Sequence, residues 1–203
     1  MKKPIIAVDV DDVLSKTSQG FVEFSNKTWG HTLSPDDYDE DWAKVWGVSV
    51  EAARERADFV HENGMIGEFS NFPEAFAVLM KLKECYTLVV ATSRRASIET
   101  LSKDWLQRHY GGIFSGVYFS GIYDGKLGKH EEIITRTKNE LLVEIGADYL
   151  IDDQLKHCIA AGEHGVDAVL FGNYAWNQSV DLPKHVTRCA DWEAVEAYFA
   201  TKR

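Results

Sequence analysis

The chain has 203 residues, of which 45% are hydrophobic and 27% charged, a composition ordinary for one globular domain or a domain with an insertion. Its 32 acidic and 22 basic residues give a formal net charge of -10, so most of its surface should repel nucleic acid polymers and anionic membranes. No stretch is long and apolar enough to span a bilayer, and the three scattered cysteines favour a reducing, cytoplasmic compartment over a disulfide framework.

Short apolar runs alternate with helix-like segments along most of the chain. The expected strands are residues 5–8, 87–91, 117–119, 149–151 and 168–171. The expected helices are one capped by Asn71 with Pro73 in its first turn, one opened by Ser97 and closed at residues 111–112, and two more over residues 155–163 and 192–199. This alternation predicts an α/β fold built on a doubly wound, Rossmann-like parallel sheet.

Residues 17–70 interrupt the alternation, because no strand pattern occurs there. Three helical stretches are expected instead, around Phe21 and Phe24, from Ser34-Pro35, and over residues 49–62. The segment is too long for a loop in a compact domain. We therefore expect a small α-helical subdomain, residues 17–70, inserted into a core made of residues 1–16 and 71–203. The acidic run 36–41 lacks the Gly and Glu of a calcium loop and is best explained as the first turn of a helix.

Three carboxylates, Asp9, Asp11 and Asp12, follow the first expected strand. Like charges this close disfavour one another's ionisation unless a cation or a chemical role offsets the cost. Alternate side chains of an extended segment share a face, so Asp9 and Asp11 should point one way and Asp12 the other. The simpler alternative is a strand that ends in an acidic turn.

Matching polar residues follow two other expected strands. Thr92 and Ser93 come after residues 87–91, and Asp152 and Asp153 end the run that begins at residue 149. Ligands of open α/β sheets bind at the carboxyl ends of the strands. Carboxylates gathered there suit Mg2+, a hard cation that prefers oxygen ligands. The sequence therefore predicts a metal and phosphate site at this edge.

A phosphate site in so acidic a protein needs a local cation. Thr137 and Glu140 have the spacing of a capping box, which makes Lys138 the first residue of a helix that leads into the strand before Asp152. Lys126 and Lys129 are alternatives, more naturally explained as solvated loop charges. Of Arg94 and Arg95, which follow the hydroxyl residues, Arg94 is the stronger candidate for a contact with a substrate anion.

DVDDVL, VVATS, a helix-initial lysine and LIDD, in this order, resemble the four motifs of the haloacid dehalogenase (HAD) superfamily, and the resemblance covers nearly the whole chain. An Asp two residues after the first is the mark of the phosphatases in that superfamily. The helical insertion after the first motif matches its first type of cap. The Thr-Arg-x-Lys stretch resembles the 5'(3')-deoxyribonucleotidase-like branch.

The resemblance implies a Mg2+-dependent phosphomonoester hydrolase that acts through an aspartyl-phosphate on a small phosphorylated metabolite, with nucleoside monophosphates among the candidates. Asp9 would be the nucleophile, and Asp11 the general acid and then the general base. Thr92 and Lys138 would bind the phosphoryl group, with Ser93 and Arg94 as further substrate contacts.

The same resemblance implies the metal ligands. Mg2+ would be held by the Asp9 carboxylate, the Asp11 backbone carbonyl and Asp152. Asp153 would ligate through water or orient the site.

Three positions depart from the family pattern. Asp12 stands where a Gly is usual at a sharp turn, and Asp tolerates unusual backbone angles better than most residues. Thr17 stands where deoxyribonucleotidases carry an aromatic residue that stacks on the base. The turn after the second expected strand reads Thr-Ser-Arg-Arg rather than Thr-Ser-Pro. The last two departures weigh against a nucleotide substrate.

Two other classes share some of these features. A two-component receiver domain needs its phosphoacceptor at the end of a middle strand and has no helical insertion, so it fits poorly. A catalytically silent, phosphatase-like binding or regulatory protein would keep the fold without turnover, although every catalytic position is filled here. A phosphatase assay separates this alternative from the enzyme.

Two further residue pairs have competing explanations. Trp42 and Trp46 are four residues apart and should share a helix face, so we expect them to pack inside the inserted bundle. The alternative is that one of them faces the cleft and favours a flat or apolar leaving group. His157, next to Cys158, lacks partners at metal-ligand spacing, which predicts a helix-surface or packing role.

Overall fold

The computed structural model describes residues 2–39, 41–120, 136–179 and 181–202. Its centre is a six-stranded, all-parallel sheet, so the predicted doubly wound α/β fold is confirmed. The strands are β1 (Ile5–Val8), β2 (Thr87–Thr92), β3 (Val117–Phe119), β4 (Tyr149–Asp152), β5 (Asp167–Phe171) and β6 (Val186–Cys189), in the spatial order β3-β2-β1-β4-β5-β6.

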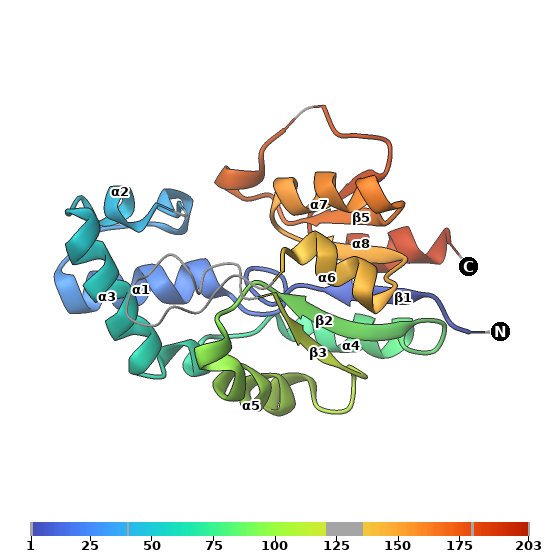
Figure 1. The fold of residues 1–203 in the computed structure, drawn as a ribbon, viewed down its shortest axis with the longest axis horizontal. Helices are drawn as coiled ribbons and strands as arrows, with labels where there is room; N and C mark the ends of the chain where they lie inside the picture. Colours follow the sequence, from blue (N-terminus) through green and yellow to red (C-terminus); the bar gives the residue numbers. More distant parts are fainter. Residues whose placement is uncertain (1, 40, 121–135, 180, 203) are drawn as a thin grey trace.

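Helices cover both faces of the sheet (Figure 1). They are α4 (Pro73–Leu82), α5 (Glu99–Tyr110), α6 (Lys138–Ile145), α7 (Leu155–Ala161) and α8 (Trp192–Ala200). Ile6 and Val8 of β1 join an apolar cluster with α4, α5 and α8, whereas Ile5 and Ala7 join a second cluster with α6 and α7. Both faces are therefore buried, which explains why the strands are apolar runs without alternation.

The sixth strand, β6, is not among the predicted strands. Only Val186 and Cys189 of this strand are buried, and Thr187 is exposed, because β6 lies at the edge of the sheet. Such a short, half-polar segment gives no apolar run. The β-branched pair Val186-Thr187 between Pro183 and Asp191 is the only signal that could have indicated it.

The predicted helix starts at Asn71 and Ser97 are wrong. Residue 72 occupies the N-cap position of α4 and makes no side-chain cap, while Asn71 pairs with Ser15 in an isolated bridge, so tertiary pairing decides the conformation there. Ser97 lies inside the short 3-10 turn η3 (Ala96–Ile98), and α5 begins only at Glu99. The helix predicted over residues 155–163 is shorter than expected: α7 ends at Ala161, and the 3-10 turn η5 (Gly162–His164) follows it.

Between β1 and α4 the described residues form helices and turns and no strand, as expected from the missing strand pattern in residues 17–70. Figure 1 shows these helices at the end of the molecule opposite the two chain termini. They are α1 (Thr17–Trp29), α2 (Trp42–Trp46) and α3 (Val50–Glu62), with 3-10 turns η1 (Pro35–Asp37) and η2 (Met65–Glu68). We call residues 17–70 the insertion.

The acidic run begins in the first turn of a helix as predicted, because Ser34 is the N-cap of the 3-10 helix η1 and Asp36 and Asp37 lie in its first turn. The turn η1 ends at Asp37, and a separate helix, α2, begins at Trp42. Asp41 is its N-cap, and its carboxylate accepts hydrogen bonds from the N–H groups of Ala43 and Lys44. Asp is among the residues preferred at such an N-cap position.

A third apolar cluster lies within the insertion. It includes Phe21, Trp46, Val60 and Phe69, and it extends to Ile98 of η3. Trp46 is buried, and its indole N–H donates to the hydroxyl of Ser25, 3.0 Å away. Within the described ranges, the structure contains no helix that is both long and apolar enough to cross a membrane.

Candidate active site

Three adjacent strands deliver polar side chains to the same edge of the sheet. Asp9 follows β1 directly, while Thr92 and Asp152 are the last residues of β2 and β4. Because β1 lies between β2 and β4, these residues are neighbours in space although they are far apart in sequence. The predicted gathering of acids and hydroxyls at this edge is therefore present.

Lys138 lies between two of the carboxylates. Its Nζ is 2.8 Å from Asp9 Oδ1 and 2.6 Å from Asp152 Oδ2, and its side chain is only 2% exposed. The predicted capping box brings it there: Thr137 Oγ1 accepts from the Glu140 N–H, and Glu140 accepts from the Thr137 N–H, which makes Lys138 the first residue of α6. The alternatives, Lys126 and Lys129, lie outside the described residues.

Burial and charge shift the pKa values of these groups in opposite directions. Burial, together with the charges of Asp152 and Asp11, outweighs the opposing effect of Lys138 and raises the pKa of Asp9 to about 7. Burial alone would also raise the pKa of Asp152, but Lys138 and His157 outweigh it and lower that pKa below its usual range. For Lys138, the two carboxylates outweigh burial and raise its pKa, so it stays charged.

Asp153 completes a group of three buried carboxylates. One oxygen from each of Asp9, Asp152 and Asp153 lies within 4.8 Å of the others. Burial, followed by the charges of Asp152, Asp12 and Asp9, raises the pKa of Asp153 well above its usual value. A divalent cation would relieve this excess of buried negative charge, and the all-oxygen donor set is the kind that Mg2+ prefers. The residues present therefore fit a magnesium ion.

Asp11 is held by a cation and a hydroxyl. The Arg94 Nε lies 3.1 Å from both carboxylate oxygens, its Nη2 lies 2.7 Å from Oδ1, and Thr17 Oγ1 donates to the same Oδ1. Burial alone would raise the pKa of Asp11, but Arg94 and Thr17 outweigh it and lower that pKa. The Arg94 guanidinium also donates to Ser102, so it is anchored within the site.

The carboxylate of Asp12 has other partners than the carboxylates of Asp9 and Asp11. The strand ends at Val8, and Asp12 has a φ of 54°, so the period of a strand no longer applies. Its carboxylate accepts from the N–H and the hydroxyl of Ser18 in the first turn of α1, and Asp12 is also one of the residues that line the cavity described next. A left-handed φ is one that Gly adopts most readily, and Asp accommodates it here.

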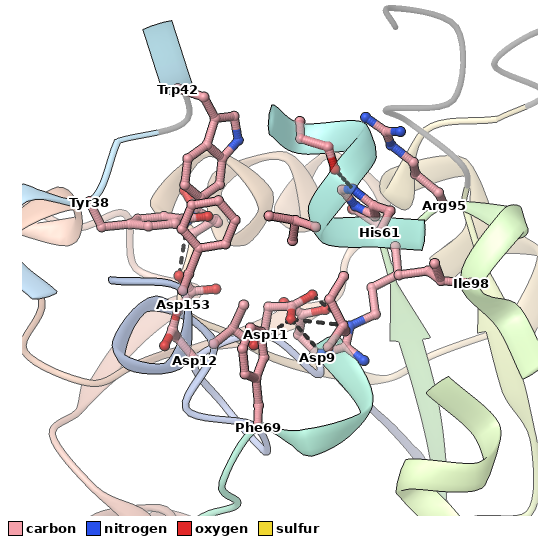
Figure 2. Close-up of a pocket in the computed structure, with 18 of the residues that line it drawn as sticks. Asp9, Asp11, Asp12, Tyr38, Trp42, His61, Phe69, Arg95, Ile98 and Asp153 are labelled. Carbon is pink, nitrogen blue, oxygen red and sulfur yellow. Dashed lines mark hydrogen bonds and ion pairs between the residues drawn. The ribbon is translucent and has the colours of Figure 1, made fainter. Parts of the chain in front are cut away.

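A cavity of about 340 Å3 opens above the carboxylates, between the sheet edge and the insertion. Figure 2 shows Asp9, Asp11, Asp12 and Asp153 at its base, Tyr38 and Trp42 along one side, and His61 and Arg95 along the other. Its apolar lining comes from both the insertion and η3: Phe21, Tyr38, Trp42, Val60, Ile66, Phe69 and Ile98.

The two hydroxyl residues have different exposures. Ser93 lines the cavity together with Arg94 and Lys138. Thr92 is fully buried, and its Oγ1 accepts a hydrogen bond from the backbone N–H of Arg94, 3.2 Å away. Thr92 thus shapes the turn that carries Arg94, and Ser93 is the hydroxyl that the cavity exposes.

Sequence reasoning missed two contributors. His157 lines the cavity, and its Nδ1 lies 3.3 Å from Asp152 Oδ2, instead of serving only as a surface or packing residue. Its place on α7, five residues after Asp152, was the available signal. Trp176, in the 3-10 turn η6 (Ala175–Asn177) after β5, donates from Nε1 to Asp153 Oδ2 at 2.7 Å. The only hint was that loops at strand ends line such sites.

The parallel sheet, the acid pair after β1, the buried lysine and the second acid pair after β4 together define a phosphatase of the HAD superfamily. The sequence profile of the family described as "5' nucleotidase, deoxy (Pyrimidine), cytosolic type C protein" matches residues 3–202. The chain therefore belongs to this family of HAD-like hydrolases, and the predicted resemblance is confirmed.

The chain is also similar to individual proteins. It is 24% identical, over 96% of its length and 69% of the other protein, to an uncharacterized 32.4 kDa protein of Enterobacteria phage T4. A haloacid dehalogenase-like hydrolase from Streptococcus pneumoniae has a similar fold, with a TM-score of 0.69, 17% identity and coverage of 97% and 98% of the two chains. The D,D-heptose 1,7-bisphosphate phosphatase of B. bronchiseptica, solved with magnesium and phosphate, has a TM-score of 0.58 at 17% identity over the full length of both chains.

Proposed function

We propose that the protein is a Mg2+-dependent phosphomonoesterase that acts on a small phosphorylated metabolite through an aspartyl-phosphate intermediate. The observation that carries this proposal is the arrangement of Asp9 and Asp11 at the base of one cavity, with Lys138 in contact with Asp9. A phosphoryl group in transfer needs a nucleophile, a proton donor and neutralisation of its oxygens, and we assign these roles to Asp9, Asp11 and Lys138.

Asp9 is the proposed nucleophile. One of its oxygens attacks phosphorus, the bond from phosphorus to the leaving oxygen breaks, and the leaving oxygen takes a proton from the Asp11 carboxyl. Water then attacks the aspartyl-phosphate, Asp11 accepts a proton from that water, and inorganic phosphate departs with Asp9 restored. Lys138 stabilises the charge on Asp9 and on the phosphoryl oxygens throughout.

Arg94 and the hydroxyls are the proposed phosphoryl contacts. Ser93 and Arg94 both line the cavity, and Arg94 already lies against the carboxylate of Asp11. Thr92, one residue earlier, would complete the turn that surrounds the phosphoryl group. Arg94 has the planar fork of donors that suits phosphoryl oxygens.

Asp9, Asp152 and Asp153 are the proposed carboxylate ligands of Mg2+, together with the backbone carbonyl of Asp11. When bound, the ion supplies charge stabilisation for the phosphoryl oxygens. The buried carboxylate group and the magnesium and phosphate in the related B. bronchiseptica enzyme support this assignment.

We also propose that the insertion is a separate cap domain over a catalytic core of residues 1–16 and 71–203. Its own apolar cluster, centred on Phe21, Trp46 and Val60, supports this division. The cap contributes the aromatic side of the cavity. It would therefore bind the leaving group, while the core would bind the phosphoryl group and catalyse its transfer. Nucleoside monophosphates are candidate substrates, since the family description names a nucleotidase and a flat base could pack against Trp42.

The experiment is an assay of the wild-type protein and Asp9→Asn against nucleoside monophosphates, sugar phosphates and an aryl phosphate. We expect wild-type turnover with Mg2+, its loss on chelation, its recovery when Mg2+ is returned, and only background activity in Asp9→Asn. Asp36→Asn, which changes an exposed carboxylate of the insertion, is the matched control and should behave like wild type. Equal activity in wild type and Asp9→Asn would rule out the proposed nucleophile, and no activity on any substrate would favour the catalytically silent alternative.

A further inference from the structure

The loop after β5 holds the carboxylate of Asp153 from outside the four sequence motifs. Asp153 Oδ2 accepts two hydrogen bonds, from Trp176 Nε1 at 2.7 Å and from Gln154 Nε2 at 2.9 Å. Asp153 Oδ1 receives neither of them. Two donors on one oxygen fix the rotation of the carboxylate and leave the other oxygen to face a cation, which is how partners outside the ligand set orient metal ligands.

The same loop is itself fastened to the core. Asn177 is fully buried, and its side-chain N–H groups donate to the backbone carbonyls of Asp153 and Phe171, both at 3.0 Å. Arg188, on the edge strand β6, donates to the side-chain oxygen of Asn177 at 3.0 Å and to its backbone carbonyl at 2.7 Å. The turn that carries Trp176 is therefore held in place by hydrogen bonds to the core, and this fixes the position of Trp176 next to Asp153.

Aromatic rings connect Trp176 to both halves of the molecule. Its ring stacks on that of Tyr174, with centroids 4.5 Å apart and planes only 4° from parallel, and the Tyr174 hydroxyl donates to the Asp12 carbonyl at 2.7 Å. On the side of the insertion, Tyr38 packs against Trp176 at 4.9 Å and against Trp42 at 5.3 Å. Figure 2 shows Tyr38 and Trp42 on the side of the cavity nearest Asp153.

We propose that Trp176 is a positioning residue that orients Asp153 for the metal and ties that carboxylate to the insertion through Tyr38. The indole N–H performs the first task, and the ring face performs the second. Metal binding at Asp153 and the position of Tyr38 in the insertion are thereby linked, because both depend on the Trp176 side chain. This inference rests on the proposed function, since it takes Asp153 as a metal ligand.

The two tasks can be separated by substitution. Trp176→Phe removes the N–H donor but keeps a ring for Tyr38 and Tyr174. Tyr38→Ala keeps the donor but removes the ring contact with the insertion. Trp46→Phe is the matched control, because it also deletes one buried indole N–H bond, to Ser25, away from the carboxylates.

The first measurement is the affinity for Mg2+ alone, by isothermal titration calorimetry on the full-length protein. We expect Trp176→Phe to weaken Mg2+ binding by about tenfold or more, as loss of a partner that orients a metal ligand does. The control Trp46→Phe should bind Mg2+ like wild type. Equal Mg2+ affinity in wild type and Trp176→Phe would overturn the orienting role.

The second measurement is amide hydrogen exchange in residues 35–46 with and without Mg2+. We expect Mg2+ to slow exchange there in wild type, and this protection to be reduced in both Trp176→Phe and Tyr38→Ala. Protection that persists in both variants, or is absent from wild type, would overturn the tie to the insertion. A wild-type protein that hydrolyses phosphomonoesters with Mg2+ but shows these negative results leaves the proposed function standing. A wild type that binds no Mg2+ contradicts both.

Discussion

Lys138 is almost fully buried, which is rare for a lysine and tolerable here because two buried carboxylates contact its ammonium group. Ion pairs of lysines on the surface contribute little to stability. Removal of the buried Lys138 charge, in contrast, leaves Asp9 and Asp152 without the lysine that they contact. Its position also serves the chemistry, since the residue that neutralises Asp9 lies beside the incoming phosphoryl group in the proposed mechanism.

Replacement of Lys138 by alanine should therefore lower kcat by about 100-fold or more, the cost of losing one preorganised donor to the transition state, about 3 kcal/mol. The same variant should unfold at a lower temperature, because two carboxylates remain buried without their partner. Steady-state kinetics and thermal unfolding measure the two effects. Lys103→Ala, which removes an exposed ion pair with Glu99, is the control and should change neither by much. A kcat close to that of wild type in Lys138→Ala would contradict the assigned role.

His61 gives the stability a pH dependence of known sign. Burial, and then the charge of Arg95, lower its pKa to about 4, whereas an unfolded histidine titrates near 6.5. Between these values the unfolded chain binds a proton that the folded His61 does not. Its contribution to stability is therefore complete above pH 6.5 and is lost as the pH falls towards 4.

We expect this loss to reach at most about 3 kcal/mol, and less if solvent reaches the ring. The measurement is the free energy of unfolding in urea at pH 7.5, 5.5 and 4.5 for wild type and His61→Gln. Carboxylates titrate equally in both proteins, so the difference between them isolates His61. Parallel pH profiles would show that His61 does not carry the effect.

At the scale of elements, the start of α6 decides where Lys138 lies. The reciprocal hydrogen bonds of Thr137 and Glu140 fix the first turn, and Gly146, with a φ of 69°, ends the helix before β4. This arrangement is local, because its signals are all within ten residues of one another. That is why the sequence alone predicts it.

Thr137→Ala should lower the free energy of unfolding by about 1 kcal/mol, the usual cost of losing an N-cap. It should also reduce kcat, since a frayed first turn no longer holds Lys138 against Asp9. Urea denaturation and steady-state kinetics test both expectations. The matched control is Thr28→Ala, at an exposed position in the last turn of α1, where alanine should be neutral or slightly stabilising. A stable and fully active Thr137→Ala would mean that tertiary contacts alone place Lys138.

At the scale of the whole molecule, the cavity exists because the insertion lies over the sheet edge. This arrangement gives the two tryptophans of α2 different surroundings. Trp46 is buried in the cluster of the insertion, as expected for core packing. Trp42 contacts the same cluster but also lines the cavity, as the alternative required. The two rings pack together with centroids 5.2 Å apart, yet of the two only Trp42 lines the cavity.

Trp42→Ala should raise KM for the preferred substrate several-fold while leaving turnover of a small aryl phosphate nearly unchanged. Trp46→Ala should instead lower the free energy of unfolding by about 3–5 kcal/mol, because it opens a hole in a packed cluster. Kinetics on both substrates, together with urea denaturation, distinguish the two variants. If both variants lose stability and activity on every substrate alike, the rings are only core.

The amino-acid sequence by itself determined the α/β class, five of the six strands, the helical insertion, and the acids and hydroxyls at the strand ends. These features follow from periodicity and from hydrogen bonds between residues close in the chain, such as the capping box at Thr137. The parallel order of the strands then brings Asp9 and Asp152 together without further information.

Only the tertiary structure decided the partners of those residues. Arg94 donates hydrogen bonds to Asp11, which is 83 positions away in the sequence, and Trp176 donates one to Asp153, which is 23 positions away. The edge strand β6, which sequence patterns miss, carries the Arg188 that fastens the loop of Trp176. Such contacts depend on how packed elements are aligned in space, and no periodicity or short-range spacing within one segment encodes that alignment.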